Sequence, residues 1–403
     1  KTLIFMSTSI FVAICILLLL SYLFDISAAK TKIPSVILLL GLGWAVKELT
    51  VFLEFEIPDL SEVLPVLGTI GLILIVLEGS LELELNKSKL PFVGKTSLIS
   101  FIPILIISLT LAYAFYYFGN SNFKDAIVNA IPFAIISSAI AIPSAQHLLS
   151  KNKDFITYES SLSDIFGVIY FNFMLRNAII DFSSVGTFIL NIIVTLIITV
   201  IATLSLAFFL GKIRHPVKFI PIIIITVLIY VIEKHYHLPS LIFILLFGLF
   251  LGNLDELRNN KYIYKLHPEI LEKEVHKFSE LTQEISFLVR SLFFLLFGYL
   301  IDTKELFNQD TILWAVPITA GIFILRFIFL SVFKLSITPL VYIAPRGLIT
   351  ILLFLSIPAE RKIPLVNNSL IIQVILLSAL VMMVGLMTHR KKTEFKGKLE
   401  ETF

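Results

Sequence analysis

The sequence predicts an all-α polytopic membrane protein, and its composition is the first reason. Hydrophobic residues make up 57% of the 403 residues and charged residues only 15%, whereas a soluble domain carries about 25% charged residues. So few charges cannot cover a surface in water, and the lipid bilayer must supply the missing solvent. The net charge of +3 points to no nucleic-acid partner, and the single cysteine, Cys15, excludes an internal disulfide.

Long apolar runs are the second reason. A helix needs about 20 apolar residues to cross the hydrocarbon core of a bilayer, and we find thirteen such runs. Leu3–Phe24 is the first, and it is longer than the apolar region of a typical signal peptide. The predicted spans are 3–24, 33–52, 61–81, 90–118, 125–149, 154–178, 184–211, 216–233, 238–253, 281–301, 309–333, 337–356 and 367–388.

The basic residues predict the orientation of these spans. With the C-terminus in the cytoplasm, the cytoplasmic segments hold 21 Lys and Arg residues and the outer segments hold 8. Cytoplasmic loops of membrane proteins carry such an excess, so we expect the N-terminus outside. The charged stretch 254–280 is either a helix on the cytoplasmic surface or a solvated connector.

Asp164 is the strongest candidate for a functional side chain. It lies about ten residues into the sixth predicted span, near the middle of the bilayer, where ionisable groups are costly and mark functional sites. Ser160 is four residues earlier and shares its helix face, and Ser163 is its neighbour in sequence. Hydroxyl oxygens beside a carboxylate suit the coordination of a hard cation. A structural aspartate paired with an arginine is the alternative.

We single out one proline in each of two spans, the fifth and the twelfth. Pro143 lies in the fifth span and Pro345 in the twelfth, and a proline bends or breaks a helix. We therefore expect a break at each proline. Spans one to six and eight to thirteen then form two inverted repeats, at about 3–178 and 216–388. They are joined by a linking helix at about 184–211 and followed by a cytoplasmic tail, 389–403. Inverted repeats with broken helices are typical of secondary transporters.

These residues resemble the sodium/proton exchanger branch of the cation:proton antiporters. Glu159-Ser160-Ser161-Leu162-Ser163-Asp164 is similar to the family stretch E-S-x-x-N-D. Glu78-Gly79 resembles the family's F-E-G segment, and Phe297-Gly298 up to Asp302 resembles the end of its tenth span. Arg326 and Arg346 fall where the family has two late arginines.

The resemblance implies a fold and a set of roles. The fold has thirteen spans, with the broken fifth and twelfth spans crossing beside the sixth, and assembles as a homodimer. Asp164 is then the ion-binding acid, Glu159 is held by Arg326 in a structural ion pair, and Arg346 steadies the crossing.

The sequence departs from the family in two places. Ser163 stands where the family has asparagine, and Ala141-Ile142-Pro143 stands where it has T-D-P. A threonine hydroxyl and a carboxylate are therefore missing near the ion. Ser163, Ser144 and Ser138 are candidate replacements, together with carbonyls freed by Pro143.

We expect an exchanger of one monovalent cation for one proton by competition at Asp164, with Na⁺ first and Li⁺ or K⁺ as alternatives. The only nearby second acid is engaged by an arginine, so we expect electroneutral exchange. A proton-coupled carrier of organic solutes and an antiporter-like protein without ion binding remain alternatives. Neither an enzyme nor a channel is favoured, because we find no second catalytic group and no repeated filter. We expect no cofactor, and we expect the inner membrane of a bacterium.

Overall fold

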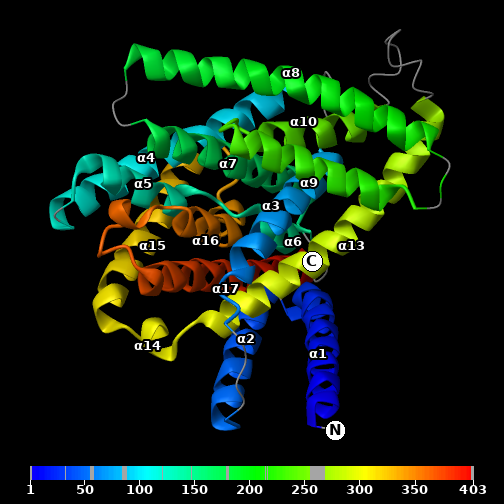
Figure 1. Ribbon diagram of the computed structural model, residues 1–403. Helices are drawn as coiled ribbons and strands as arrows, with labels where there is room; N and C mark the ends of the chain where they lie inside the picture. Colours follow the sequence, from blue (N-terminus) through cyan, green and yellow to red (C-terminus); the bar gives the residue numbers. More distant parts are fainter. Residues whose placement is uncertain are drawn as a thin grey trace.

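The computed structural model describes residues 2–31, 33–54, 59–83, 89–119, 121–146, 148–177, 181–213, 215, 217–254 and 268–400. Within these ranges the regular structure is helical throughout, which confirms the predicted fold class (Figure 1). The helices are α1 (Thr2–Thr31), α2 (Ser35–Phe52), α3 (Val63–Glu82), α4 (Leu90–Phe118), α5 (Phe123–Ala134), α6 (Ser138–Ala145), α7 (Ser150–Arg176), α8 (Phe182–Lys212), α9 (Phe219–His235), α10 (Leu241–Gly252), α13 (Pro268–Leu300), α14 (Thr303–Leu306), α15 (Gln309–Val332), η1 (Leu340–Tyr342), α16 (Leu348–Leu355), η2 (Ala359–Arg361) and α17 (Asn368–Glu400).

Every predicted span overlaps a helix of the structure, but the number of crossings stays a prediction. Eight helical stretches of the described chain are long and apolar enough to cross a membrane by length and composition. The orientation also stays a prediction, because some of the basic residues on which it is based lie outside the described ranges.

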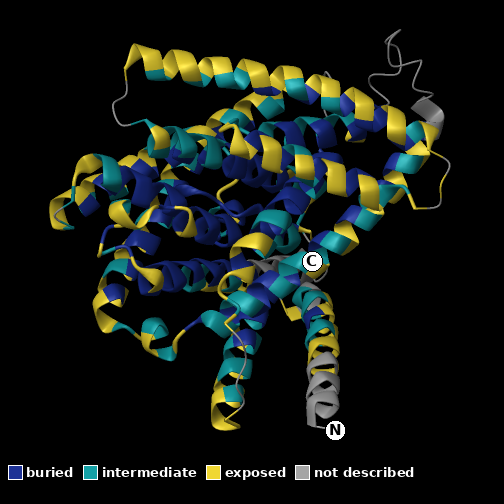
Figure 2. Ribbon diagram, viewed as in Figure 1, coloured by how far each residue is buried: buried dark blue, intermediate teal, exposed yellow. Residues whose placement is uncertain are grey.

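The helices fall into two groups by their contacts. In the first group, which we call the core bundle, α4, α5, α6 and α7 pack on one another, α15 packs on α17, and α16 packs on α5 and α7. In the second, the scaffold bundle, α2 and α3 pack on α13, and α10 packs on α3 and α8. Burial is highest in the middle of the molecule, along α5 and α6 of the core bundle, whereas α8 exposes much of its length at one side (Figure 2).

Polar caps start three of the helices. Asn122 accepts a hydrogen bond from the backbone N–H of Asp125 at the start of α5, and Asn308 does the same for Asp310 at α15. At α8, Asp181 and Ser184 form a reciprocal capping box. These side chains satisfy backbone donors that a helix start leaves unpaired, so the loops themselves set where these helices begin.

The fifth and twelfth predicted spans are both interrupted, but Pro143 does not mark the first interruption. The chain leaves helical geometry at 135–137, between α5 and α6, and Pro143 lies inside α6. In the twelfth span Pro345 does lie in the interruption, at 343–347 between η1 and α16. The two interruptions touch, because Ser137 N–H donates to the Pro345 carbonyl at 2.9 Å. Whether the broken helices cross within the membrane stays a prediction.

The break at Pro143 was predicted wrongly because tertiary partners decide where this helix opens. The N–H groups of Ile136, Ser137 and Ser138 are each bound to an acceptor from another segment. Donors satisfied in this way need no helical carbonyl. A proline, in contrast, removes one hydrogen bond, which the turns around it in α6 tolerate.

The charged stretch 254–280 is described only in part. Its first part, 255–267, lies outside the described residues, and its second part continues α13 without a break into the tenth predicted span. Leu271, Val275 and Phe278 are buried, and Lys218 pairs with Glu274 at 2.6 Å. A buried apolar face and an ion pair therefore hold residues 268–280 within α13, and the position of this part relative to the membrane surface stays a prediction. Likewise, α17 continues to Glu400, past the predicted end at 388.

Glycine permits a close approach of two helix backbones, α2 and α13, within the scaffold bundle. A Cβ atom on Gly43 of α2 would lie 2.2 Å from the carbonyl oxygen of Leu295 in α13, and one on Gly298 would lie 2.4 Å from the carbonyl oxygen of Leu40. Small residues let helix backbones pack this closely in membranes. Gly41 lies two residues before Gly43 on the same helix, and a Cβ atom on it would have no neighbour within 4 Å.

We predict that Gly43→Ala lowers thermal stability and that Gly41→Ala does not. Overpacking costs about 1–3 kcal/mol, whereas alanine in place of an exposed helical glycine gains about 1 kcal/mol. Thermal unfolding of the two purified variants in the same detergent tests this. Equal melting temperatures for the two variants would contradict the α2–α13 packing.

Candidate functional site

Asp164 lies in the middle of α7 with a relative exposure of 1%. One of its carboxylate oxygens, Oδ2, accepts hydrogen bonds from both the hydroxyl and the backbone N–H of Ser138, the latter at 3.2 Å. The other oxygen, Oδ1, is buried and has no hydrogen-bond partner among the described residues. The carboxylate is thus held at one oxygen and open to a ligand at the other.

The carboxylate of Asp164 also faces a helix end. Ser138 is the first residue of α6, and its N–H is one of the donors that a helix start leaves free. The helix dipole places partial positive charge at this end. The interruption between α5 and α6 therefore aims a positive helix end at Asp164.

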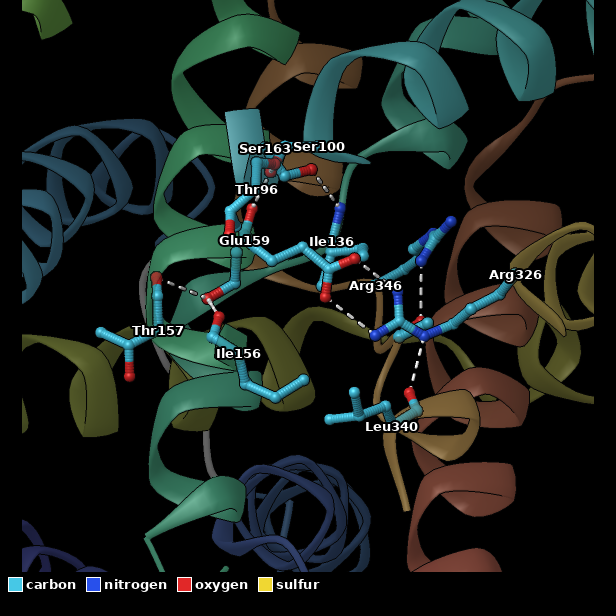
Figure 3. Close-up of polar contacts among 12 residues, drawn as sticks. Thr96, Ser100, Ile136, Ile156, Thr157, Glu159, Ser163, Arg326, Leu340 and Arg346 are labelled. Carbon is cyan, nitrogen blue, oxygen red and sulfur yellow. Dashed lines mark hydrogen bonds and ion pairs between the residues drawn. The ribbon is translucent and has the colours of Figure 1, made fainter. Parts of the chain in front are cut away.

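Glu159 and Arg326 form a buried, bidentate ion pair. The two terminal nitrogens of Arg326 donate to the two carboxylate oxygens of Glu159 at 2.9 Å each. Its Nε donates to the Leu340 carbonyl in η1 at 2.8 Å, as Figure 3 shows. The pair ties α7 to α15 and to the segment before the second interruption, so it fixes the frame around Asp164.

Arg346 satisfies the other end of the interrupted helix. Its side chain is 1% exposed, and it donates to the carbonyl of Phe133 at 2.6 Å and to the carbonyl of Ala134 at 3.5 Å. These are the last two residues of α5, whose carbonyls carry partial negative charge. A third bond, to the Ala344 carbonyl at 2.7 Å, joins the arginine to its own interruption. Positive charge thus faces the carbonyl end of α5, and Asp164 faces the amide end of α6.

The predicted hydroxyl ligands have different local roles. Ser138 bonds Asp164, as described above. Ser163 accepts the Ile136 N–H at 3.0 Å and so supports the interruption. Ser160 donates to the Ile156 carbonyl at 2.7 Å and Ser144 to the Ile140 carbonyl at 2.7 Å, and both keep their lone pairs available to a cation. The structure brings Ser138 to Asp164, and it shows no contact of Ser144 or Ser163 with that carboxylate.

Two serines of the site were not predicted from the sequence as site residues. Ser137 bridges the two interruptions through its backbone, and its hydroxyl is buried without a partner. Ser161, one turn before Asp164 on α7, also has a buried hydroxyl without a partner. Both are ordinary serines in sequence, although Ser161 could have been noted as the second hydroxyl residue flanking Asp164 at helical spacing.

A cavity of about 120 Å³ leads toward the site between α1, α3, α6 and α13. Ser138 and Ile142 line it together with three acids, Asp25, Glu78 and Glu82, and one base, Arg290. A cleft lined mainly by one sign of charge concentrates ions of the opposite sign. The lining therefore favours cations.

A second, much smaller cavity of about 20 Å³ lies beside the Glu159–Arg326 pair and also touches Arg346. Most of its other lining is apolar and includes Ile99, Pro103 and Ile104. Glu159 and Arg326 bind each other through two hydrogen bonds, without any contribution from Asp164.

Neither of the two buried arginines pairs with Asp164. All the side-chain hydrogen bonds that the structure shows from Arg326 and Arg346 go to Glu159 and to backbone carbonyls. No group of three or more His, Cys, Asp or Glu side chains that could hold a metal ion occurs in the described part of the chain. The site is built around one free carboxylate, which suits a weakly held monovalent cation.

An all-helical chain in which two interrupted helices meet beside a buried acid is the architecture of a secondary transporter. The comparisons agree: residues 14–390 match the family described as sodium/hydrogen exchanger, transmembrane. This protein belongs to the sodium/hydrogen exchanger family.

Solved structures show the same fold. One structure of the sodium proton antiporter MjNhaP1 from Methanocaldococcus jannaschii, at pH 8, matches with a TM-score of 0.65 at 20% identity, over 92% of this chain and 97% of that one. Another of the same antiporter, from electron microscopy, matches with a TM-score of 0.68 at 18% identity, over 96% of each chain. None of the curated proteins matches the chain in sequence.

We predict that Arg326→Ala strongly destabilises the protein. Removal of one partner leaves the Glu159 carboxylate buried and uncompensated, which costs about 3–5 kcal/mol. The control is Lys277→Ala, because Lys277 pairs with Glu274 at 3.7 Å with 61% of its side chain exposed, and such pairs contribute about 0–1 kcal/mol. Thermal unfolding of both variants tests this. A loss for Arg326→Ala no larger than that of the control would contradict the assigned role.

Proposed function

We propose that this protein exchanges a monovalent cation for a proton at Asp164. The observation that carries the proposal is the state of the carboxylate. It is buried, it is held by Ser138 at one oxygen, and its other oxygen has no partner. A bare carboxylate removed from water is costly. Binding either a proton or a cation at Oδ1 relieves that cost, so the two ligands compete for one site.

Competition at a single acid gives exchange if the empty site crosses the membrane poorly. With a proton or a cation bound, Asp164 is neutral overall and can move with the core bundle. Without a ligand it carries a charge whose transfer through the low-dielectric interior is costly. Each crossing in one direction must then carry a cation and each return a proton.

The dimensions of the site favour an inorganic ion over an organic solute. Pockets for drug-sized ligands measure about 300–1,000 Å³, whereas the cavity that reaches Ser138 measures about 120 Å³. The Ser138 hydroxyl is bonded to Asp164, and the hydroxyls of Ser160 and Ser161 lie within one helical turn of it on α7. Oxygen ligands of this kind suit hard cations. We propose Na⁺ as the first candidate, with Li⁺ and K⁺ as alternatives.

Electroneutral exchange is part of the proposal. Asp164 is the acid left free for exchange, because both oxygens of Glu159 are bound by Arg326. Ile142, where the related pattern has an aspartate, brings no second carboxylate to the site. One proton would then replace one cation, and no net charge would move.

We further propose that the protein works as a homodimer in a bacterial inner membrane, with the N-terminus outside. The dimer follows from the family resemblance. The apolar residues that α8 exposes, among them Ile189, Ile193 and Ile197, offer a surface for lipid or for a second copy. We propose in addition that the core bundle moves against the scaffold bundle, with the acid-lined cavity as the cytoplasmic entrance.

We predict that Asp164→Asn abolishes cation-dependent proton movement. Asparagine keeps the shape of the side chain but can neither bind a proton nor offer a charge to a cation. The measurement is the pH change inside proteoliposomes after addition of Li⁺, Na⁺ or K⁺. Asp302→Asn is the control, since this aspartate pairs with Lys47 and is 68% exposed. Cation-driven proton movement in Asp164→Asn at the wild-type rate would contradict the proposal.

We predict that the exchange rate does not depend on membrane potential. If a second proton moved with each cycle, one net charge would cross, and its energy would change by about 2.3 kcal/mol per 100 mV. Proteoliposomes clamped at opposite potentials with K⁺ and valinomycin, and driven by Na⁺, test this. Protein-free liposomes give the proton leak to subtract. A rate that follows the potential after that subtraction would rule out one-for-one exchange.

A further inference from the structure

We propose that Ser161 supplies an oxygen to the cation at Asp164 and that Gly79 of α3 leaves the room that this arrangement needs. The inference rests on the proposed exchange at Asp164 and adds a residue to that site. In the motif that this stretch resembles, the position of Ser161 is unspecified, so the assignment depends on the structure of this chain.

The hydrogen bonding of Ser161 sets it apart from its neighbours on α7. Thr157 donates to the Lys153 carbonyl at 3.0 Å and Ser160 to the Ile156 carbonyl at 2.7 Å, which is the usual way to satisfy a hydroxyl inside a helix. Ser161 is 2% exposed, yet its hydroxyl has no partner. A buried polar atom left unpaired is uncommon and calls for an explanation.

The position of Ser161 offers that explanation. It lies three residues before Asp164 on α7, so the two side chains are neighbours on the helix surface with Cβ atoms about 5–6 Å apart. The carboxylate oxygen Oδ1 of Asp164 is also buried and unpaired. A cation between them would satisfy both oxygens at once.

Gly79 places Ser161 beside the route to the site. A Cβ atom on Gly79 would lie 3.0 Å from the Ser161 hydroxyl oxygen and 3.6 Å from Cδ1 of Ile142. Gly79, Ile142 and Ser138 all line the acid-lined cavity. Ser161 therefore lies directly behind a glycine of the cavity wall, at the contact between α3 and the core bundle.

The chemistry fits both states of the site. With a cation bound, the lone pairs of Ser161 face the ion and its hydrogen can turn to the Thr157 carbonyl, one turn back. With a proton bound, the same lone pairs accept a hydrogen bond from the Asp164 carboxyl. Ile142 offers no oxygen from α6, so the hydroxyl of Ser161 supplies one from α7.

The test is the cation dependence of exchange by Ser161→Ala in proteoliposomes, with Na⁺ as the probe. We expect the half-saturating Na⁺ concentration to rise roughly tenfold, because the variant loses the interaction between a neutral hydroxyl and the charged ion. The maximal rate should stay within about twofold of wild type.

Thr157→Val is the control. It removes a hydroxyl of the same helix that is already hydrogen-bonded, and it should leave both the half-saturating concentration and the maximal rate near wild type. Ser161→Cys keeps the volume and replaces a hard oxygen with a soft sulfur. It should share the defect of Ser161→Ala, and it serves as the test variant if the alanine protein fails to fold.

Three results would overturn the assignment, and they differ from one another. A half-saturating concentration within about twofold of wild type shows that Ser161 does not bind the ion. A loss of maximal rate without a change in half-saturation shows a role in packing alone. If wild type itself moves no protons with Na⁺, Li⁺ or K⁺, the proposed exchange fails and the role of Ser161 fails with it.

Discussion

The rest of the site depends on one constraint: a helix that opens inside the protein must have its free backbone groups satisfied. Between α5 and α6 the chain loses helical hydrogen bonding at 135–137. Unpaired carbonyl and N–H groups at membrane depth cost several kcal/mol each. Arg346 covers the carbonyl end and Asp164 the amide end. The helix end that must be neutralised thus also positions the acid that can bind an ion.

This constraint separates two kinds of buried charge. Arg346 and the Glu159–Arg326 pair have their hydrogen bonds filled by protein groups, and they hold α7, α15 and the second interruption in place. Asp164 keeps one oxygen free. A fully bonded charge changes its protonation with difficulty, whereas a half-bonded one responds to a proton or a cation. The same membrane depth therefore holds a rigid framework and an exchangeable group.

The sequence predicted the helical fold and singled out Asp164, because both depend on properties that a single segment displays. Apolar length gives a helix, and a carboxylate in the middle of such a length stands out. The pairing of Glu159 with Arg326 came from family resemblance and not from a local pattern, since 167 residues separate them. The position of the first break was missed because Ser163, Pro345 and Asp164 set it from other segments. Pro143 gave a local signal that these distant acceptors outweighed.

The face of α3 that contacts the core bundle contains several glycines. Along α3, three glycines face side chains of other helices: Gly68 faces Leu352 of α16 and Phe293 of α13, Gly71 faces Val289 of α13 and Leu348 of α16, and Gly79 faces Ser161 of α7 and Ile142 of α6. Interlocked side chains would hold two helices in one register, because packed interiors resist even small changes of volume. At Gly68 the Leu352 side chain fills the place of a missing side chain, because a Cβ atom there would lie 2.3 Å from Cδ2 of Leu352. The glycines of α3 therefore receive side chains of the core bundle and let the two bundles pack closely. The geometry around Asp164 is held by charges within the core bundle, whereas the contact with the scaffold bundle depends on this close packing against α3.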